Sequence, residues 1–520
     1  MRGAVAAGHE ITAQGGARAL EEGGNAVDAC IAAAFTSWVA ESPLTGPGAG
    51  GFMLVHRARD RSSRLLDFFV AAPGQGRPRR TDAEMDAVDI PFEGSETTQR
   101  FLIGHSSCAV PGTVAGLAAA HRSYGTLPWK ELVAPAIELA REGVVMTKAQ
   151  AALHALLDSI LRHTPESRAV YGQRTRLVAG DRLVASDLAG TLEVLAAEGP
   201  DALYRGELGA AIAVHVQEHG GAITRRDLET YRVIRRRPVE VAYRGHAFES
   251  NPPPSSGGVL IGYGLALLDR AGPSGATGSA PELVRVLEVL REQTRARDER
   301  FTRELYRGGL ARRLLSEGSL AAATRRLGSA PQTEVASPGG TTHISAMDAD
   351  GNAASLSAST GAGSGVVVPG TGIHMNNMLG EYDLQPGGHA AKPGTRLTSM
   401  MSPSVVSRGG EPRLVLGSAG SVRLRGAVMQ VVVNVVEHGL SVSEAIDSPR
   451  VHVDGEHIHC EGGHDPSSLD ELVRMGYDVV PWRRRNLYFG GVAAVERRPD
   501  GTLAAAGDPR RGGHGIVVGG

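Results

Sequence analysis

The chain has 520 residues, of which 42% are hydrophobic and 21% are charged, and a chain of this length can bury a substantial core. Its 54 basic and 56 acidic residues give a formal charge of −2, so no long-range positive field would attract nucleic acid or an acidic membrane. These values exclude a nucleic-acid-binding tail and favour a large soluble enzyme.

Helical periodicity and strand-like alternation divide the chain into blocks. Apolar residues recur at helical spacing in five stretches: 12–40, 129–164, 186–218, 281–327 and 423–438. The region 341–420 is rich in strand signals. Long helical runs flanking a strand core favour layers with sheets inside and helices outside. Two segments rich in Pro, Gly, Ser and charge, 74–100 and 328–340, are expected to be mobile.

The N-terminal sequence carries no targeting signal that we recognise, because Glu10 and Gln14 interrupt any apolar run. The longest later apolar stretch, 428–436, contains Gln430 and Asn434 and is too short to cross a bilayer. We therefore expect a cytoplasmic protein without membrane contact. The cysteines are isolated, as expected of reduced thiols: Cys30, Cys108 and Cys460.

No sequence motif predicts a metal or another cofactor. The chain has no Cys-x-x-Cys and no His-Glu-x-x-His spacing. His457 and His459 alternate on a strand-like segment, which we interpret as a surface feature. The expected chemistry therefore depends on protein side chains alone.

The most informative segment is Ser-Pro-Gly-Gly-Thr-Thr-His-Ile-Ser at 337–345. A threonine hydroxyl is a weak nucleophile that needs a nearby base, and a free α-amine on the same residue can supply one. Two glycines before Thr341 leave the preceding peptide bond uncrowded. Thr341 is therefore a candidate for a nucleophile that is exposed by cleavage after Gly340.

The sequence after Gly340 predicts a hairpin that brings a second hydroxyl beside Thr341. A two-residue Asp-Gly turn at 350–351 would place Thr341 opposite Thr360. A looser turn over 348–352 would pair Met347 with Ala353 and Thr341 with Ser359. An ordinary hairpin with hydroxyls on a polar face fits the same residues, so the hairpin alone does not decide the function.

Short motifs of small, polar and glycine residues occur in order along the whole chain. The early motifs are Ala-Ala-Gly-His at 6–9, Glu-Gly-Gly-Asn-Ala-Val-Asp-Ala at 22–29, Gly-Pro-Gly-Ala-Gly-Gly-Phe-Met at 46–53, Val-Pro-Gly-Thr-Val-Ala-Gly-Leu at 110–117, Gly-Gly-Ala-Ile-Thr at 220–224 and Pro-Pro-Pro-Ser-Ser-Gly-Gly at 252–258. The later ones are Met-Asn-Asn at 375–377, Met-Ser-Pro at 401–403, Leu-Gly-Ser-Ala-Gly-Ser at 416–421 and Asp-Pro-Arg at 508–510. One motif can arise by chance, but the ordered set is specific, and it resembles the γ-glutamyltransferase (glutathione hydrolase) family of N-terminal-nucleophile hydrolases.

The resemblance implies an α+β fold, a four-layer αββα sandwich, in which the chain cuts itself. Thr341 would attack the Gly340 carbonyl, leaving a large subunit 1–340 and a small subunit 341–520 that stay together as one unit. The same hydroxyl would then form an acyl-enzyme that water or an amine acceptor resolves. By resemblance, Ser359 stands at the second pocket threonine, and the amides of Gly420 and Ser421 form the oxyanion hole.

The residues that hold a γ-glutamyl group in the family have diverged here. The family binds the donor carboxylate with an arginine and a serine pair, and these positions correspond to Phe69 and to Ser399 with Met400. The family residues that bind the α-amine correspond to Gly361, Met378 and Glu381, and only the last is charged. Losing an arginine grip on a carboxylate removes a bidentate ionic contact, so we expect a less polar donor or a differently placed anion.

Two alternatives apply to this pocket. Phe69, Met378 and Met400 fit core positions equally well, and Arg396 or Arg423 are candidates to replace the missing cation. Either would change which residues contact the donor.

Three functions are consistent with the sequence. The first is an autoprocessed amidohydrolase or acyltransferase of the γ-glutamyltransferase type, with a donor that need not be γ-glutamyl. The second is a relative that cleaves a carbon–carbon bond in the biosynthesis of alkylproline antibiotics. The third is an uncleaved homologue that acts as a binding protein. For the first two, the expected partners are a small-molecule acyl donor with water or an amine acceptor, together with the paired cleavage fragments.

Overall fold

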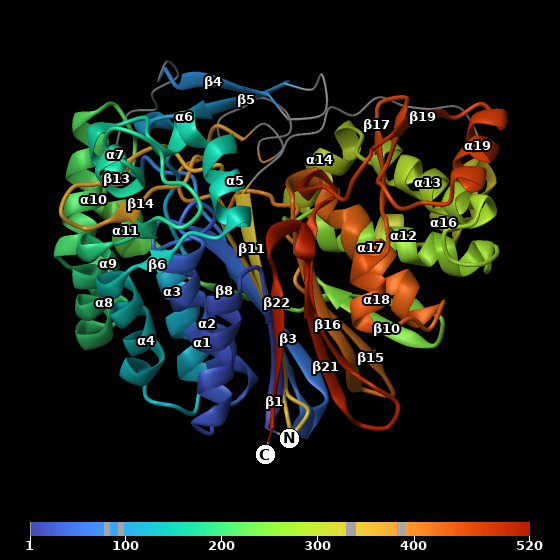
Figure 1. Cartoon of the computed structure of the whole chain (residues 1–520), viewed down its shortest axis with the longest axis horizontal. Helices are drawn as coiled ribbons and strands as arrows, with labels where there is room; N and C mark the ends of the chain where they lie inside the picture. The colour runs from blue at the N-terminus through green and yellow to red at the C-terminus, as the bar shows by residue number, and fades with distance from the viewer. Residues whose placement is uncertain are drawn as a thin grey trace.

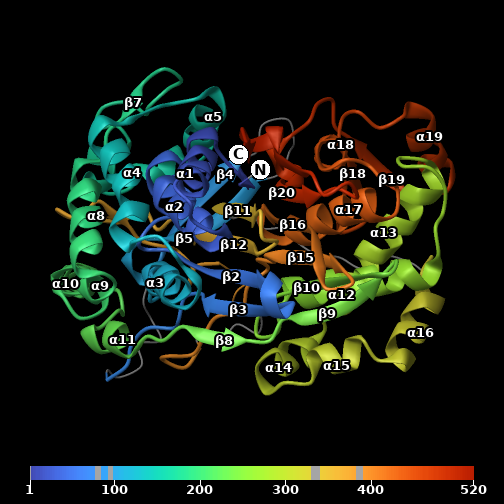
Figure 2. The ribbon, with the colours of Figure 1, turned by 90° about the horizontal axis from the view of Figure 1, so that it is seen from below.

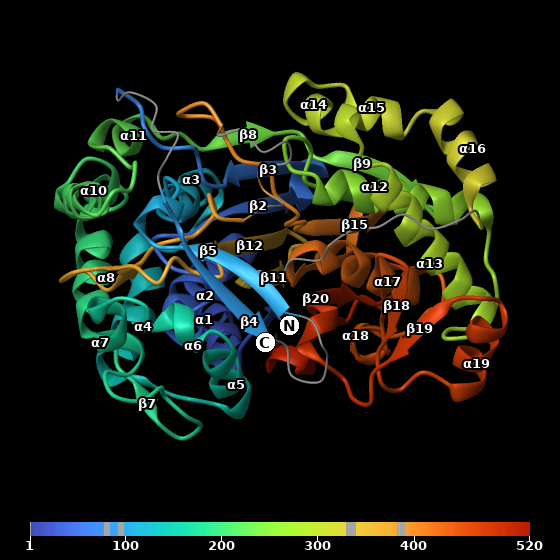
Figure 3. The same cartoon turned by 90° about the horizontal axis from the view of Figure 1, so that it is seen from above.

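The computed structural model of the chain describes residues 2–76, 84–91, 98–328, 340–381, 384 and 391–519. Two large sheets pack face to face at its centre, and helices cover the outer face of each (Figure 1). Seen from below and from above, the same four layers follow one another across the molecule (Figures 2 and 3). This is the αββα sandwich that the resemblance implied.

The two sheets are formed by strands from distant parts of the chain. The first has the order β22 (His514–Val518), β1 (Gly3–Ala7), β11 (Gly340–Asp348), β12 (Ala353–Gly361), β2 (Gly50–Arg57), β3 (Ser62–Phe68) and β8 (Ile234–Arg236). The second has the order β21 (Leu503–Gly507), β20 (Gly491–Arg497), β16 (Glu411–Ala419), β15 (Ser404–Arg408), β10 (His246–Ser250) and β9 (Val239–Tyr243). The two ends of the described chain meet at β1 and β22, where the Arg2 amide donates to the Val518 carbonyl at 3.0 Å.

Helices from the first half of the chain form one outer layer, and later helices form the other (Figure 1). The first group comprises α1 (Glu10–Glu21), α2 (Ala26–Ala40), α3 (Thr113–Tyr124), α4 (Trp129–Glu142), α5 (Lys148–Leu156), α6 (Asp158–Leu161), α7 (Pro165–Tyr171), α8 (Ser186–Glu198), α9 (Asp201–Tyr204), α10 (Glu207–Glu218) and α11 (Arg225–Thr230). The second comprises α12 (Gly257–Ala271), α13 (Ala280–Arg295), α14 (Glu299–Arg307), α15 (Leu310–Leu314), α16 (Glu317–Arg326), α17 (Leu424–Val436), α18 (Val442–Asp447) and α19 (Pro466–Arg474).

Short strands complete the structure at the periphery. They form the pairs β4 (Asp86–Pro91) with β5 (Thr98–Ile103), β6 (Val144–Val145) with β7 (Arg182–Leu183) and β13 (Val367–Val368) with β14 (Ile373–His374), and a sheet of β17 (Val451–Asp454), β18 (His457–Cys460) and β19 (Asp478–Pro481). The β4–β5 hairpin lies across the top of the sandwich (Figure 3).

The central strands β11 and β12 are buried at every position because both faces of their sheet are covered. On β11, Ile344 and Ala346 belong to the core beneath the first helical layer, whereas Met347 belongs to the core on the other side. This alternation follows the two-residue period of a strand. It directs every second side chain, including that of His343, toward the second sheet.

The two sheets approach closely where a glycine and several serine hydroxyls lie between them. A Cβ on Gly417 of β16 would lie 2.3 Å from Cε1 of His343, so this position accepts no side chain. Ser355 donates to the Leu416 carbonyl at 3.0 Å, and Ser345 donates to the Ala493 carbonyl at 3.1 Å. A polar layer between the sheets thus holds β11 and β12 in a fixed position.

The predicted blocks have the expected kind of secondary structure, helix or strand. Some of them are divided into shorter elements that the periodicity did not predict. The stretch 12–40 contains two helices, because Asn25 caps α2 with its side chain and ends the continuous pattern. The three cysteines are all free and buried. Of the segments expected to be mobile, 77–83, 92–97 and 329–339 lie outside the described residues, whereas 86–91 form the paired strand β4.

Among the described residues, no helix is both long enough and apolar enough to span a bilayer.

Candidate active site

Thr341 lies in a β-bulge at the start of β11. The pairing of Met347 with Ala353 continues regularly to Thr342 opposite Ala358, and then shifts so that Gly340 pairs with Gly361. One residue of β11, Thr341, therefore faces two residues of β12, Ser359 and Thr360. The looser of the two predicted turns is confirmed by this register, and the bulge is an addition that the pattern did not predict.

The two hydroxyls opposite Thr341 have different partners. The Ser359 hydroxyl donates to the carbonyl oxygen of Gly340 and accepts from the Gly361 amide at 2.8 Å. The Thr360 hydroxyl instead donates to the Pro43 carbonyl at 3.1 Å. Ser359 is thus the hydroxyl that contacts the peptide group immediately before Thr341, and both Thr341 (4% exposed) and Ser359 (3% exposed) are buried.

A buried carboxylate holds the residue after Thr341. Glu41, just beyond the end of α2, accepts from the Thr342 hydroxyl at 2.6 Å and from the Thr12 hydroxyl at 2.7 Å. Glu41 therefore ties β11 to the helical layer. No sequence motif marked Glu41, because its two partners, Thr12 and Thr342, come from distant parts of the chain.

His343 lies close to Thr341 in sequence, but its ring is fully engaged in the layer between the sheets. Its Nδ1 lies 2.8 Å from the Ser357 hydroxyl and its Nε2 lies 2.9 Å from the Ser345 hydroxyl. Burial lowers the pKa of His343 to about 3, so the ring is neutral near pH 7. A ring with both nitrogens bonded to buried serines has a positioning role and leaves no free nitrogen to act as a base for Thr341.

The predicted oxyanion turn follows β16. Gly420 has φ 135° and Ser421 has φ 55°, and Ser421 begins the short 3₁₀ turn η4 (Ser421–Arg423) that leads into α17. A serine in the left-handed region is uncommon and places backbone amides in an orientation that a strand or helix does not offer. The preceding residue, Ala419, lines the same cavity as Thr341.

This cavity has mostly apolar walls, and two arginines, Arg510 and Arg511, are among its lining residues. Its lining includes Ala40, Leu44, Ala149, Ala152, Leu153, Leu487, Thr341 and Arg511. The Nη2 atom of Arg511 lies 3.8 Å from the position that a Cβ would occupy on Gly420. Arg511 is partly exposed, yet its Nε atom is buried without a hydrogen-bond partner in the described part of the chain.

The electrostatic setting of Arg511 differs from that of its neighbours. Burial, followed by repulsion from Arg423, lowers the pKa of Arg511 to about 10, so it remains charged at neutral pH. The adjacent Arg510 is paired with Glu461 and with Asp508, the latter at 3.1 Å. Arg511 forms no ion pair within the described ranges, and it is therefore available to bind an anion. The sequence interpretation stopped at Asp-Pro-Arg and missed this residue.

Three residues predicted to contact the donor belong to the hydrophobic core. Phe69, Met378 and Met400 are 0%, 2% and 4% exposed and share one apolar cluster. Phe69 stacks on Phe52 with ring centroids 5.4 Å apart. None of the three is among the described residues that line the cavity beside Thr341, so the structure agrees with the core alternative.

The two arginines considered as replacement cations have other contacts. Arg396 lies 3.2 Å from the carboxylate of the buried Asp67, and its guanidinium also donates to the Phe69 carbonyl and packs 4.7 Å from the Tyr231 ring centroid. Arg423 stacks over the Tyr488 ring at 4.4 Å. Arg396 in particular is already neutralised by a carboxylate.

The remaining predicted residues lie near the bulge or in a supporting loop. Oε1 of Glu381 lies 3.1 Å from the position of a Cβ on Gly361, the residue that pairs with Gly340. Ser399 contributes its carbonyl, which accepts from the Ser255 hydroxyl at 2.8 Å, and its hydroxyl, which accepts from the Met401 amide at 3.1 Å. Glu381 is thus adjacent to the proposed cleavage point, whereas Ser399 stabilises a loop.

Comparison with known proteins agrees with this arrangement. A family described as "Gamma-glutamyltranspeptidase" matches residues 12–518. The chain belongs to the gamma-glutamyltranspeptidase family. It is 32% identical to the "Glutathione hydrolase proenzyme" of Escherichia coli (strain K12) over 98% of this chain and 90% of that protein. It is 31% identical to the "Acylase ACY 1 proenzyme" of Pseudomonas sp. (strain SE83) over 100% of this chain and 94% of that protein.

A solved structure extends the likeness to three dimensions. The crystal structure of cephalosporin acylase from Bacillus halodurans matches with a TM-score of 0.85 and 26% identity, over 100% of this chain and 96% of that chain. The family, the αββα fold and the assignment as an enzyme of the hydrolase and acyltransferase type are therefore confirmed for this gamma-glutamyltranspeptidase family member.

Proposed function

We propose that this chain cuts its own Gly340–Thr341 bond and then uses Thr341 as an N-terminal nucleophile. The observation that carries the proposal is the hydrogen bond from the Ser359 hydroxyl to the Gly340 carbonyl, the group that Thr341 would attack. A donor on that oxygen withdraws electrons from the carbonyl carbon and stabilises the negative charge that develops during attack. The proenzyme names of two relatives are consistent with such a cut.

Each proposed step accounts for the bond that breaks and for the proton that moves. Thr341 Oγ1 attacks the Gly340 carbonyl carbon, the carbon–nitrogen bond breaks, and the nitrogen takes the hydroxyl proton to become the free amine of Thr341. Water then hydrolyses the Gly340 ester and releases the subunits 1–340 and 341–520. In the mature enzyme this amine accepts the Thr341 proton as the hydroxyl attacks a donor, and it returns the proton to the leaving amine.

The amides of Gly420 and Ser421 are the proposed oxyanion donors of the mature enzyme. The positive φ of Ser421 supports this role, because a strained backbone at a turn beside a cavity is a feature that functional sites retain. Only the backbone is required, so the serine side chain leaves the proposed role unchanged.

The proposed donor is the amide of an acyl chain that ends in a carboxylate and lacks a γ-glutamyl α-amine. Arg511 supplies a charge without an ion-pair partner among the described residues, and the apolar walls fit a hydrocarbon chain. Glu41, a carboxylate that lines this cavity, already accepts hydrogen bonds from two threonine hydroxyls. The acylase names of two relatives support a donor other than γ-glutamyl.

Three nitroanilides that differ by one group each test this donor assignment. Glutaryl nitroanilide has the terminal carboxylate, γ-glutamyl nitroanilide adds the α-amine, and pentanoyl nitroanilide lacks both polar groups. We expect the highest kcat/KM for the glutaryl compound. A γ-glutamyl rate equal to or above the glutaryl rate would refute the donor assignment, and no hydrolysis of any amide by a processed enzyme would refute the amidase assignment.

A further inference from the structure

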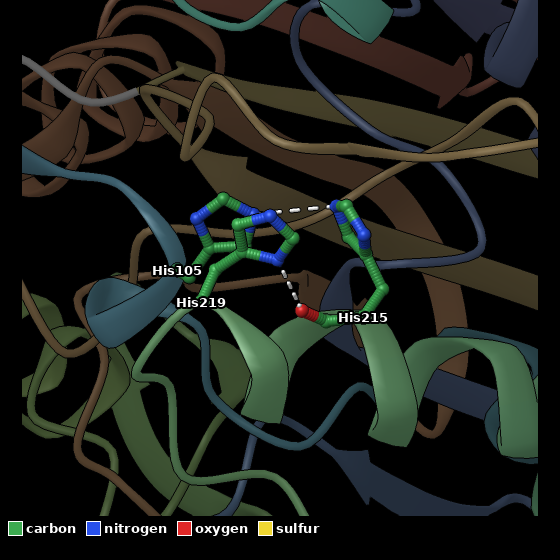
Figure 4. A group of neighbouring side chains, drawn as sticks. All are labelled: His105, His215 and His219. Carbon is green, nitrogen blue, oxygen red and sulfur yellow. Dashed lines mark hydrogen bonds between the residues drawn. The ribbon is translucent and has the colours of Figure 1, made fainter.

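Three histidines from two separate elements converge away from the cavity of Thr341. His105 begins the 3₁₀ turn η2 (His105–Ser107), His215 lies in the last turn of α10, and His219 is the residue that ends this helix. Figure 4 shows the ring of His219 lying over that of His105, with the ring of His215 beside them. None of them is among the described residues that line the cavity beside Thr341.

The ring nitrogens are spaced as ligands of one metal ion would be. One nitrogen from each ring lies within 4.8 Å of the other two, and Nε2 of His105 is 3.3 Å from Nε2 of His215. Two imidazole nitrogens bound to one tetrahedral Zn²⁺ at about 2.0–2.1 Å lie about 3.3–3.4 Å apart. The first pair thus has the separation that the metal requires, whereas the ring of His219 stacks on that of His105 with centroids 4.5 Å apart and has to turn before it can bind the same ion.

The third ring is oriented by a contact of the kind that supports metal ligands. Nδ1 of His219 lies 2.8 Å from the backbone carbonyl of His215, so this nitrogen carries the proton and donates (Figure 4). The other nitrogen, Nε2, is left with a lone pair. A hydrogen bond from one ring nitrogen to a carbonyl fixes the tautomer and raises the basicity of the other.

The surroundings of His105 and His215 favour the neutral form of both rings. Burial, followed by the neighbouring rings of His215 and His219, lowers the pKa of His105 to about 4, and the Glu166 carboxylate opposes the shift. Burial also lowers the pKa of His215. Neutral imidazoles are the form that binds metal, and the carboxyl end of α10 carries the negative end of the helix dipole.

We propose that His105, His215 and His219 form a binding site for one divalent late first-row metal ion, represented by Zn²⁺, with solvent at the fourth position. Imidazole ligands suit Zn²⁺, and three protein ligands with one open position are a common zinc arrangement. His215 and His219 are only partly buried or exposed, so the ion can reach the site from solvent.

The site is expected to fasten α10 to the loop that supports the candidate active site. The loop that begins with η2 is bound to the chain after β12: the Gly104 amide donates to the Ser364 carbonyl at 2.8 Å, and the Leu379 amide donates to the Ser107 carbonyl at 3.0 Å. A metal bridging His105 and α10 therefore links a peripheral helix to this loop. The metal is expected to stabilise the folded protein, because an ion that binds only the folded state shifts the folding equilibrium toward that state.

The test uses an untagged, chelator-stripped chain carrying Thr341→Ala, so its outcome does not depend on processing or on the proposed function. We expect calorimetry to give one Zn²⁺ per chain, Co²⁺ to give the visible bands of a tetrahedral site, and Zn²⁺ to raise the melting temperature by several degrees. His105→Ala and His219→Ala should each weaken Zn²⁺ binding at least tenfold and abolish the thermal shift.

A matched control separates this site from general histidine binding. His457 is an exposed histidine on β18, paired with Asp478 at 2.7 Å, and His457→Ala should leave the affinity unchanged. The metal-free melting temperature of His219→Ala should equal that of the parent, because this ring is exposed. No stoichiometric binding, or binding that survives both His105→Ala and His219→Ala, would overturn the proposal.

Discussion

The Ser359 hydroxyl donates a hydrogen bond to the carbonyl oxygen of Gly340, across the bulge where Thr341 faces both Ser359 and Thr360. The bulge matters because a regular register would leave only one hydroxyl beside Thr341. With two residues opposite one, Thr360 can secure the Pro43 carbonyl at 3.1 Å while Ser359 remains directed at Gly340. The backbone irregularity thus gives the two hydroxyls different partners, as the proposed polarising role of Ser359 requires.

Removing the Ser359 hydroxyl is expected to slow self-cleavage. The loss of one donor to an oxyanion typically costs about 10²–10³-fold in rate, so Ser359→Ala should accumulate uncut chain that matures slowly. Ser359→Thr keeps the hydroxyl and should mature much faster than Ser359→Ala. The measurement is a time course of fragment formation on denaturing gels after rapid purification. Equal rates for Ser359→Ala and the wild type would show that this hydroxyl has no part in the cut.

Arg511 is expected to determine the preference for an anionic donor. A hydrogen bond to a charged group contributes about 1.5–3 kcal/mol, so Arg511→Ala should reduce kcat/KM for glutaryl nitroanilide by about 10–150-fold. The same variant should hydrolyse pentanoyl nitroanilide at nearly the parent rate, because that donor offers no anion. Arg485→Ala is the control, since Arg485 is paired with Asp447 at 3.1 Å on the surface. Equal losses on both donors would contradict the specificity role.

The backbone conformation of Ser421 is expected to matter more than its side chain. Glycine adopts φ near 55° without the steric cost that serine incurs, and it keeps the amide hydrogen. Ser421→Gly should therefore process and hydrolyse donor within about twofold of the parent, with equal or slightly higher stability. A loss of tenfold or more in kcat with normal processing would assign a direct role to the serine hydroxyl.

His343 is expected to make stability depend on pH. Its pKa in the folded protein is about 3, below the unfolded value of 6.5, so the unfolded chain binds more protons between these values. The free energy of unfolding should therefore fall as pH drops from about 6.5 toward about 3, by up to about 1.4 kcal/mol per pH unit from this group. Other buried histidines, including His154 and His374, contribute in the same direction.

The contribution of His343 is isolated by comparing two single-chain variants. Urea unfolding of Thr341→Ala should lose stability faster between pH 6.5 and 4.5 than unfolding of Thr341→Ala with His343→Gln, which cannot titrate. The double variant should be less stable at pH 7, because Ser357 and Ser345 lose a well-placed partner. Parallel pH profiles for the two proteins would contradict the buried neutral histidine.

The sequence predicted those features that are local or shared with the family. The hairpin alternation indicated β11 and β12, and the looser turn placed Met347 opposite Ala353 as observed. The bulge at Thr341 was not predictable, because it depends on contacts of Thr360 with a distant loop. The motif order identified the fold and the family before any geometry was known.

Features that depend on distant packing escaped prediction. The alignment left Phe69 and Met378 between the donor pocket and the core, and only the packing shows that both lie in the core. Arg511 was not predicted, because its distinguishing feature is the absence of an ion-pair partner among the described residues. Only the spatial arrangement shows that absence. The histidine cluster joins His105 to a helix more than a hundred positions later, a separation that no short motif spans.

The identity of the first residue of the small subunit tests the central claim most directly. Intact-mass spectrometry with peptide mapping of the purified wild type should give two species, residues 1–340 and a fragment that begins at Thr341, while Thr341→Ala should give one uncut chain. A wild-type protein that remains a single 520-residue chain, or a fragment that begins at any other residue, would contradict the assignment of Thr341 as the self-generated nucleophile.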